Sequence, residues 1–281
     1  MNLLDINIPK TIWMYWHQGF DQAPVLVKKC VKTWKLHHPK WDIKLLDAQT
    51  VNDYMSAFPI SKEKFELLGL AHRSDLIRTQ LLIQHGGVWV DSTCFPIKPL
   101  DDWLFEYMES GLFLFYKPGR DRIISNWFIA AEKGNYILKK LLTDLCRYWD
   151  NNTFLNLSKK DIWYENWVKK IYNQSLLSTQ LWFTFFTRKV LKIYPYMVYH
   201  YKFHELISTD PQSKIYWEMM PKLSADGPHK LQRFGLLSPI NKDVKEIINC
   251  KKTPLFKLTW RINDKTLPKN SVLEYLYRLN K

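Results

Sequence analysis

The segment at residues 70–93, LAHRSDLIRTQLLIQHGGVWVDST, holds the side chains best suited to chemistry. Asp75 and Arg78 are three residues apart, so in a helix they share one face. Asp91 follows the apolar run 88–90, which predicts a carboxylate at the end of a strand, the edge of an α/β sheet where ligands bind. An Arg fork for phosphate or sugar oxygens, together with carboxylates for hydroxyl groups, suits a phosphorylated, polyhydroxylated ligand.

A simpler interpretation exists for each residue taken alone. Asp75 and Arg78 could form an ion pair on a solvated helix face, because such pairs are common and weak. Asp91 could merely end a strand. The joint pattern of Ser-Asp-x-x-Arg, Gly-Gly and an apolar strand closed by Asp is much harder to explain as surface decoration.

The elements around this segment must position it. Gly86 is expected to end its helix in a left-handed conformation, and alternation puts Trp89 and Asp91 on one face of the following strand. The order of strands and helices predicts an α/β fold with a mixed, mainly parallel sheet flanked by helices. Apolar spacing predicts helices over 24–38, 51–57, 65–85 and 136–149, and strands over 12–16, 41–46, 88–91 and 112–116.

The second half of the chain has a different character. Residues 155–203 are predicted to be mostly helical, and they are rich in aromatic and basic side chains. One interpretation is a helical subdomain packed on the sheet, the commoner use of an aromatic run. The other is an interfacial surface, with aromatic rings at headgroup depth and Lys and Arg facing anionic lipid.

Composition and charge narrow the class of protein. The 281 residues are 46% hydrophobic and 15% aromatic, which excludes a disordered chain. Of the net charge of +14, residues 141–281 carry +11, which favours an anionic partner: nucleic acid, a membrane face or a phosphorylated ligand. Nucleic acid is the weakest of these, because the basic residues form no RNP motif, zinc finger or basic zipper.

The spacing of the cysteines and the hydropathy of the chain indicate the cellular compartment of the protein. The four cysteines are widely spaced and form no C-x-x-C motif. The first ten residues lack the pattern of a secretory leader, and the most apolar run, 181–186, is too short to span a bilayer. These features predict a cytoplasmic protein without a transmembrane anchor.

The motifs carry a resemblance to a known family. Residues 70–93 resemble the core of glycosyltransferase family 32, in which Ser-Asp-x-x-Arg precedes Gly-Gly-x-Tyr-x-Asp-x-Asp, the DxD motif. The opening IPKTIWMYWHQGFDQAP and the later CVKTWKLHHPKWDIKLLD are similar to its capsular polysaccharide synthesis branch. The resemblance covers residues 8–135, and KLTW at 257–260 resembles a C-terminal motif that closes over the donor diphosphate.

The resemblance implies a single GT-A-like (Rossmann-like) domain over residues 1–281. Residues 1–150 would be the nucleotide-sugar-binding core, and residues 151–281 a helical, basic region near the acceptor or the membrane. Trp16 would stack on the nucleotide base, unless it is a core tryptophan. The implied catalytic residues are Asp91, Arg78 and Asn126, and the implied donor-binding residues are Trp16, Arg73, Asp75, Arg78, Lys257 and Trp260.

Two of these assignments have alternatives. Arg73 would reach phosphate or ribose, or be a solvated flanking charge. Asn126, in the segment SNWFIA, would lie near the reacting centre, or be a strand-end residue that caps the following turn.

The sequence departs from the family motif at Thr93, because it reads Asp91-Ser92-Thr93 where the family has Asp-x-Asp. The resemblance implies a divalent cation, Mn²⁺ or Mg²⁺, but the second carboxylate is its usual ligand and Thr supplies only a neutral oxygen. Either Asp91, waters, the diphosphate and a C-terminal ligand hold the metal, or basic residues do part of its work. The candidate supplements are Thr93, His229, Lys230, Lys257 and Trp260, with Asp226 to His229 expected to form a loop.

Taken together, the sequence predicts a bacterial glycosyltransferase at the inner face of the cell membrane. It would move a hexose from a UDP-sugar, UDP-galactose or UDP-glucose, to a hydroxyl of a lipid-linked capsule or lipopolysaccharide acceptor. The family resemblance implies that this transfer retains the anomeric configuration. The alternatives are a catalytically decayed carbohydrate-binding scaffold and, from another class, a nucleic-acid-binding protein.

Overall fold

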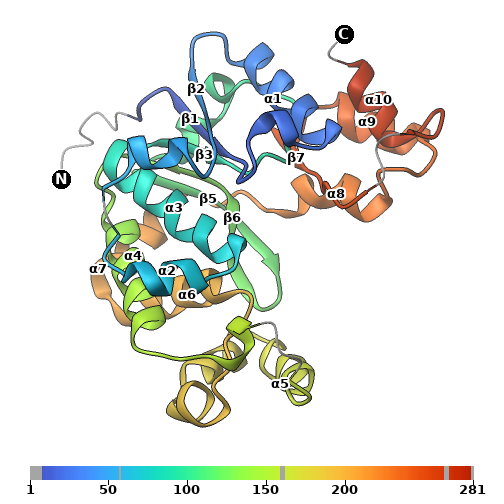
Figure 1. The fold of residues 1–281 in the computed structure, drawn as a ribbon. Helices are drawn as coiled ribbons and strands as arrows, with labels where there is room; N and C mark the ends of the chain where they lie inside the picture. Colours follow the sequence, from blue (N-terminus) through green and yellow to red (C-terminus); the bar gives the residue numbers. More distant parts are fainter. Residues whose placement is uncertain (1–7, 57, 159–161, 263–265, 280–281) are drawn as a thin grey trace.

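A five-stranded sheet in the order β2-β1-β3-β6-β5 forms the centre of the computed structural model, which describes residues 8–56, 58–158, 162–262 and 266–279 (Figure 1). The prediction that the first ten residues lack a secretory leader rests mostly on residues 1–7, which lie outside these ranges. The prediction of an α/β fold with a mixed sheet flanked by helices is confirmed. The strands are β1 Thr11–Tyr15, β2 Asp42–Leu46, β3 Gly87–Val90, β5 Leu112–Gly119 and β6 Arg122–Ala131.

The sheet is less parallel than the sequence predicts. β1 pairs in parallel with β2 and β3, whereas β6 pairs in antiparallel fashion with β3 and β5. Half of the pairings are therefore antiparallel, so "mainly parallel" needs correction. The difference comes from β6, the longest strand and one that the hydropathy pattern does not predict.

Each face of the sheet packs against its own layer. Trp13 and Trp89 join a core that includes Leu81, and Ile12 and Val88 join a second core on the opposite face. The predicted alternation along β3 is therefore confirmed. The first layer is built by α3 Leu70–His85, α4 Tyr136–Asp150, α6 Val198–Thr209 and α7 Pro211–Met219, and the second by α1 Val25–His37 with the short turns Leu100–Asp102 and Leu104–Tyr107.

Local boundaries refine the predicted helices. The predicted helix 65–85 is two helices, α2 Lys62–Leu67 and α3, because Leu68 and Gly69 adopt extended backbone. Gly86 ends α3 with a φ of 68°, as expected, and a Cβ there would lie 2.8 Å from the Lys133 nitrogen, so only glycine fits. The predicted helix 51–57 is a 3₁₀ turn, Thr50–Tyr54.

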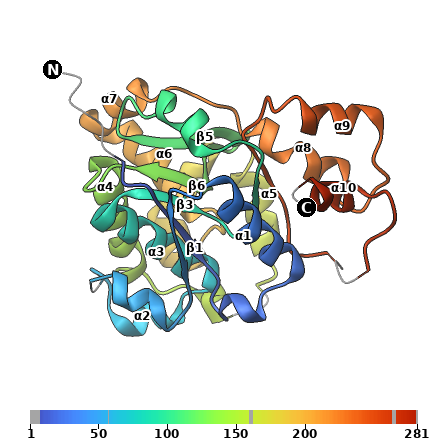
Figure 2. The same cartoon turned by 90° about the horizontal axis from the view of Figure 1, so that it is seen from above.

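The C-terminal part forms a separate layer beside the sheet, visible in Figure 2 as the red and orange helices on the right. A two-stranded sheet of β4 Cys94–Pro96 and β7 Leu255–Lys257 anchors this layer to the middle of the chain. Its core joins side chains of α1, β4 and β7 to three helices. These are α8 Asp226–Phe234, α9 Lys242–Asn249 and α10 Val272–Arg278.

A small helical projection lies at the opposite end of the molecule, below α6 in Figure 1. We call residues 162–196 the aromatic lobe. It contains α5 Glu165–Tyr172, the 3₁₀ helix Ser178–Phe183 and the π-helix Phe186–Leu191, packed around Val168, Trp182 and Ile193. Within the described ranges, no helix is long and apolar enough to cross a membrane.

Candidate active site

The predicted residues converge at the end of β3. Because β1 and β3 are parallel, Trp16 and Asp91, which follow them, lie at the same edge of the sheet. Only residues 128–131 of β6 pair with β3, so the first half of β6 continues past the end of that strand. Asn126 thereby comes beside Asp91, whose amide donates to the Trp127 carbonyl over 2.8 Å.

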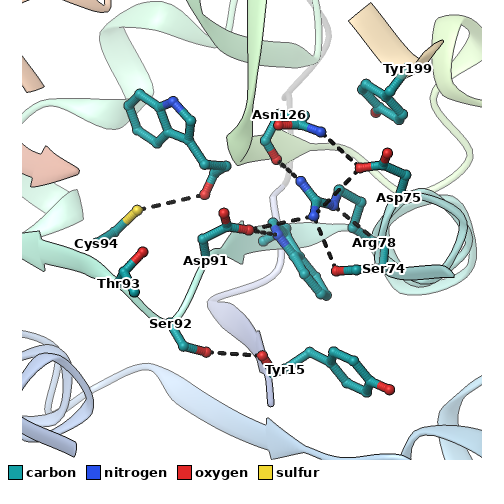
Figure 3. A network of polar contacts seen from close by, with 12 residues as sticks. Tyr15, Ser74, Asp75, Arg78, Asp91, Ser92, Thr93, Cys94, Asn126 and Tyr199 are labelled. Atoms are coloured by element: carbon teal, nitrogen blue, oxygen red, sulfur yellow. Dashed lines mark hydrogen bonds and ion pairs between the residues drawn. The ribbon is translucent and has the colours of Figure 1, made fainter. Parts of the chain in front are cut away.

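Arg78 is the centre of a buried polar network (Figure 3). Its side chain is 6% exposed, and Nη2 lies 3.6 Å from Asp75 Oδ1 and 3.5 Å from Asp91 Oδ1. Nε donates to the Ser74 carbonyl and Nη2 to the Ser74 hydroxyl, both over 3.1 Å, while Nη1 donates to the Asn126 carbonyl. The interpretation of Asp75 and Arg78 as a pair on a solvated helix face is therefore wrong.

Asn126 completes this network from the neighbouring strand. Its Nδ2 donates to Asp75 Oδ1 over 2.8 Å, so one residue contacts both members of the helical pair. It lies inside β6, away from either strand end, and this rules out the alternative role as a turn cap. The side chain is thus fixed beside two charged groups at the sheet edge.

Lys257 reaches the same place from the C-terminal layer. The register of β7 on β4 sets Lys257 opposite Cys94. Its Nζ donates to Asp91 Oδ2 over 2.9 Å and to Thr93 Oγ1 over 2.7 Å. The side chains of Asp91 and Lys257 are 28% and 17% exposed, so this ion pair remains accessible to a ligand, unlike Arg78 behind it.

The charges of this pair are mutually stabilised. Burial alone would raise the pKa of Asp91, but Lys257 and Arg78 outweigh it and hold that pKa below its usual range. Burial alone would lower the pKa of Lys257, but the Asp91 carboxylate outweighs it and raises that pKa. The site therefore keeps a carboxylate and an ammonium at neutral pH.

The other predicted donor-binding residues divide into two groups. Trp16 and Trp260 come together edge to face at 5.9 Å, although one follows β1 and the other follows β7. Trp260 is 46% exposed and Trp16 is half-buried, so both rings can meet a ligand and Trp16 is no core tryptophan. Arg73 instead donates to the carbonyls of Leu68 and Glu66, which secures the junction of α2 and α3.

The residues present do not form a ligand set for a divalent cation. The described ranges contain no group of three or more His, Cys, Asp or Glu side chains that could hold one. Thr93 Oγ1 accepts from Lys257, and His229 packs edge-on against Trp127 at 5.6 Å with its Nδ1 toward Gln232. His229 and the exposed Lys230 belong to the first turns of α8, so the predicted loop at 226–229 is also corrected.

Sequence reasoning assigned no functional role to three residues of the site. Ser74 carries part of the Arg78 network, and it stands in the Ser-Asp-x-x-Arg motif that could have revealed it. Trp89 donates from Nε1 to Asp91 Oδ1 over 3.1 Å and lies 5.0 Å below the Arg78 guanidinium, in line with the alternation of β3. His200 on α6 is buried near Arg78 and Asp91, and no sequence signal places it there.

Comparison with known proteins identifies the family of the chain. The model of the capsular polysaccharide synthesis protein family matches residues 2–157, more than half of the chain. The chain belongs to this family. The predicted resemblance to the capsular polysaccharide synthesis branch is therefore confirmed.

The chain is also similar to several fungal proteins. It is 29% identical over 167 residues to O-glycosyltransferase braB of Annulohypoxylon truncatum, covering 53% of this chain and 39% of that one. It is 24% identical over 269 residues to the putative glycosyltransferase HOC1 of Saccharomyces cerevisiae, covering 87% and 60%. With the initiation-specific α-1,6-mannosyltransferase of Schizosaccharomyces pombe it shares 28% identity, covering 55% and 43%.

The chain thus spans about two fifths to three fifths of the length of these relatives. Among solved structures, PaToxG glycosyltransferase aligns over 86% of this chain and 84% of its own, with a TM-score of 0.39 and 16% identity.

Proposed function

We propose that this protein is a glycosyltransferase that transfers a hexose from a nucleoside-diphosphate sugar to a hydroxyl group. The observation that carries the proposal is the accessible Asp91–Lys257 pair with the buried Arg78 network behind it, at the ligand-binding edge of the sheet. Such a set of paired, opposite charges is costly to bury without a function for it. The family and the glycosyltransferases similar to the chain support the same reaction class.

The chemistry of each group suits one part of such a donor. Lys257 carries a positive charge where a diphosphate would need it, and Asp91 can accept from ribose or sugar hydroxyls. Asp75, held by Arg78 and Asn126, can accept from further sugar hydroxyls at the inner side of the site. Trp16 and Trp260 offer ring surfaces to the base, and stacking contributes about 1–3 kcal/mol per base.

Transfer then needs positioning and charge stabilisation rather than a covalent nucleophile. We propose that the bond between the anomeric carbon and the diphosphate breaks with its electron pair on the phosphate oxygen. The acceptor oxygen forms the new bond from the same face, with retention, and its proton passes to the leaving diphosphate. Negative charge develops on the diphosphate as it leaves. The site has two cations, Arg78 and Lys257, whose charges would stabilise it, and this supports the proposed bond cleavage.

The proposed donor is UDP-galactose or UDP-glucose, and the proposed acceptor a lipid-linked glycan of a bacterial capsule or lipopolysaccharide. The aromatic lobe supports a membrane-bound acceptor. Its apolar side chains are unusually exposed, with Trp163 90%, Leu177 82% and Phe185 71% exposed. Five basic residues and one acidic residue accompany them, a composition typical of peptides that lie in an anionic headgroup layer.

The experiment that tests the function is donor hydrolysis across a panel of UDP- and GDP-sugars. We expect turnover of one sugar nucleotide by the wild-type protein and none by Asp91→Ala. Binding of a sugar nucleotide without turnover, even with acceptor glycolipids added, would favour the decayed carbohydrate-binding scaffold. No turnover and no thermal shift with any nucleotide would contradict the proposal.

A further inference from the structure

We infer that the ammonium group of Lys257 takes the place of a divalent cation in this site, so that the donor diphosphate binds without metal. The inference rests on the proposed function, because it concerns how the same site holds a nucleoside diphosphate. It begins with the position of Nζ, which lies between the two side chains of the Asp91-Ser92-Thr93 motif that could face a metal.

The first step is occupancy. Nζ is 2.9 Å from Asp91 Oδ2 and 2.7 Å from Thr93 Oγ1, which are hydrogen-bond distances. The other Asp91 oxygen accepts from Trp89 Nε1 over 3.1 Å and lies 3.5 Å from Arg78 Nη2. Both oxygens of the only carboxylate in the motif are thus engaged by cationic or N–H groups before any ligand arrives.

The second step is charge. Asp75 and Asp91 contribute two negative charges at the centre of the site, and Arg78 and Lys257 contribute two positive charges. These four charges sum to zero, and both cations stand beside Asp91, so this carboxylate is already neutralised and has little attraction left for a divalent cation. The Lys257 ammonium is the more exposed of the two cations, and Lys is a known point-charge partner for phosphate.

The third step is how firmly the lysine is held. Lys257 belongs to β7, whose ladder with β4 is extended by a hydrogen bond from the Leu258 amide to the Thr93 carbonyl over 2.9 Å. An ammonium has three N–H donors, and Asp91 and Thr93 use two of them. The third can go to a ligand oxygen, so Thr93 orients the ammonium where the family motif has a carboxylate.

The test measures binding of UDP and of GDP by calorimetry, once with EDTA and once with Mn²⁺. We expect at least one nucleotide to bind the wild-type protein with dissociation constants that agree within about twofold in the two buffers. Lys257→Met should weaken that binding at least tenfold in EDTA. The matched control is Lys252→Met, which removes an exposed lysine five residues earlier and should bind like the wild type.

A double variant sharpens the test. Thr93→Asp combined with Lys257→Met restores two carboxylates and removes the ammonium, so its nucleotide binding should become dependent on Mn²⁺. Binding by the wild-type protein only with Mn²⁺ would overturn the inference and leave the proposed function standing. Binding of neither nucleotide in either buffer would overturn both. The wild-type comparison decides the matter even if the Lys257 variants do not fold.

Discussion

The site at the end of β3 buries charged side chains, whereas the aromatic lobe exposes large apolar ones. In the site, charged side chains are buried: Arg78 is 6% exposed and Asp75 11%. In the lobe, large apolar side chains face solvent, and Trp163 and Trp167 are 90% and 66% exposed. Soluble proteins normally bury apolar groups and leave charges on the surface.

The two regions differ in what offsets the unfavourable free energy of buried charges and of exposed apolar rings. Each charge of the site has a partner within the protein, which offsets the loss of hydration. The exposed rings of the lobe lie over a small core around Trp182 and face away from it, so their burial needs something outside the chain. The site is therefore complete before a ligand binds, whereas the lobe is suited to an external surface.

The largest effect is expected from removing the charge of Asp91. Asp91→Asn keeps the shape of the side chain but leaves Lys257 and Arg78 without their shared anion. We expect kcat/KM for the sugar nucleotide to fall about a hundredfold, which corresponds to about 2.7 kcal/mol. The matched control, Asp53→Asn, changes an exposed carboxylate and should keep wild-type turnover. A fall in kcat/KM of less than about threefold would contradict a catalytic role for Asp91.

We expect acid to lower the free energy of unfolding through His200, which is buried on α6 on the same side of the sheet as α3. Burial lowers the pKa of His200 to about 3, and in the described structure its Nδ1 has no hydrogen-bond partner. The unfolded chain takes up the proton near pH 6.5, so the free energy of unfolding should fall by up to about 1.4 kcal/mol per unit as pH drops from 6.5 toward 3.

Urea unfolding at pH 7 and at pH 5 measures this effect. The variant His200→Gln should show a smaller decline between the two pH values than the wild type, whatever its stability at pH 7. An equal decline in both proteins would show that His200 is not the group responsible. Residues 162–196 contain no histidine, so no histidine of the lobe adds to this decline. Burial also lowers the pKa of His38, beside α1, to about 4, and this group adds to the decline in the wild type and the variant alike.

A smaller effect is expected at the lobe. The double variant Trp163→Ser, Trp167→Ser should lower sedimentation with anionic liposomes about fivefold, because both exposed rings contribute to insertion. The control Leu36→Ser removes an apolar side chain that is 58% exposed on α1 and should bind as the wild type does. Binding to neutral liposomes as strong as to anionic ones, or insensitive to salt, would contradict an electrostatic contribution from the basic residues.

The sequence predicted the local part of this architecture well. Asp75, Arg78 and Asp91 lie within one segment, so helical spacing and strand alternation were enough to bring them near one another. β6 was missed because RIISNWFIAA is buried on both faces and therefore shows no alternation. The same strand carries Asn126 into the site, so its interior position came only from the structure.

Pairing between strands far apart in the sequence explains why the contact between Lys257 and Asp91 could not be predicted from local patterns. Lys257 was singled out only through a family motif, because its contact with Asp91 depends on a pairing of two three-residue strands far apart in the chain. Strands that short leave almost no hydropathy signal, and their register cannot be read from local patterns. The proposed division of the chain at residue 150 stays a prediction.

The central claim is that the accessible Lys257 holds the diphosphate of a sugar nucleotide, with the buried charge of Arg78 behind it. Calorimetry with UDP and uridine tests this claim most directly. Both ligands share the base and ribose, so the difference in their affinities reports the phosphates alone. We predict that the wild-type protein binds UDP at least about a hundredfold more tightly than uridine. Lys257→Met should lower this preference at least about tenfold while leaving uridine binding unchanged. The same preference for UDP in both proteins would contradict the account.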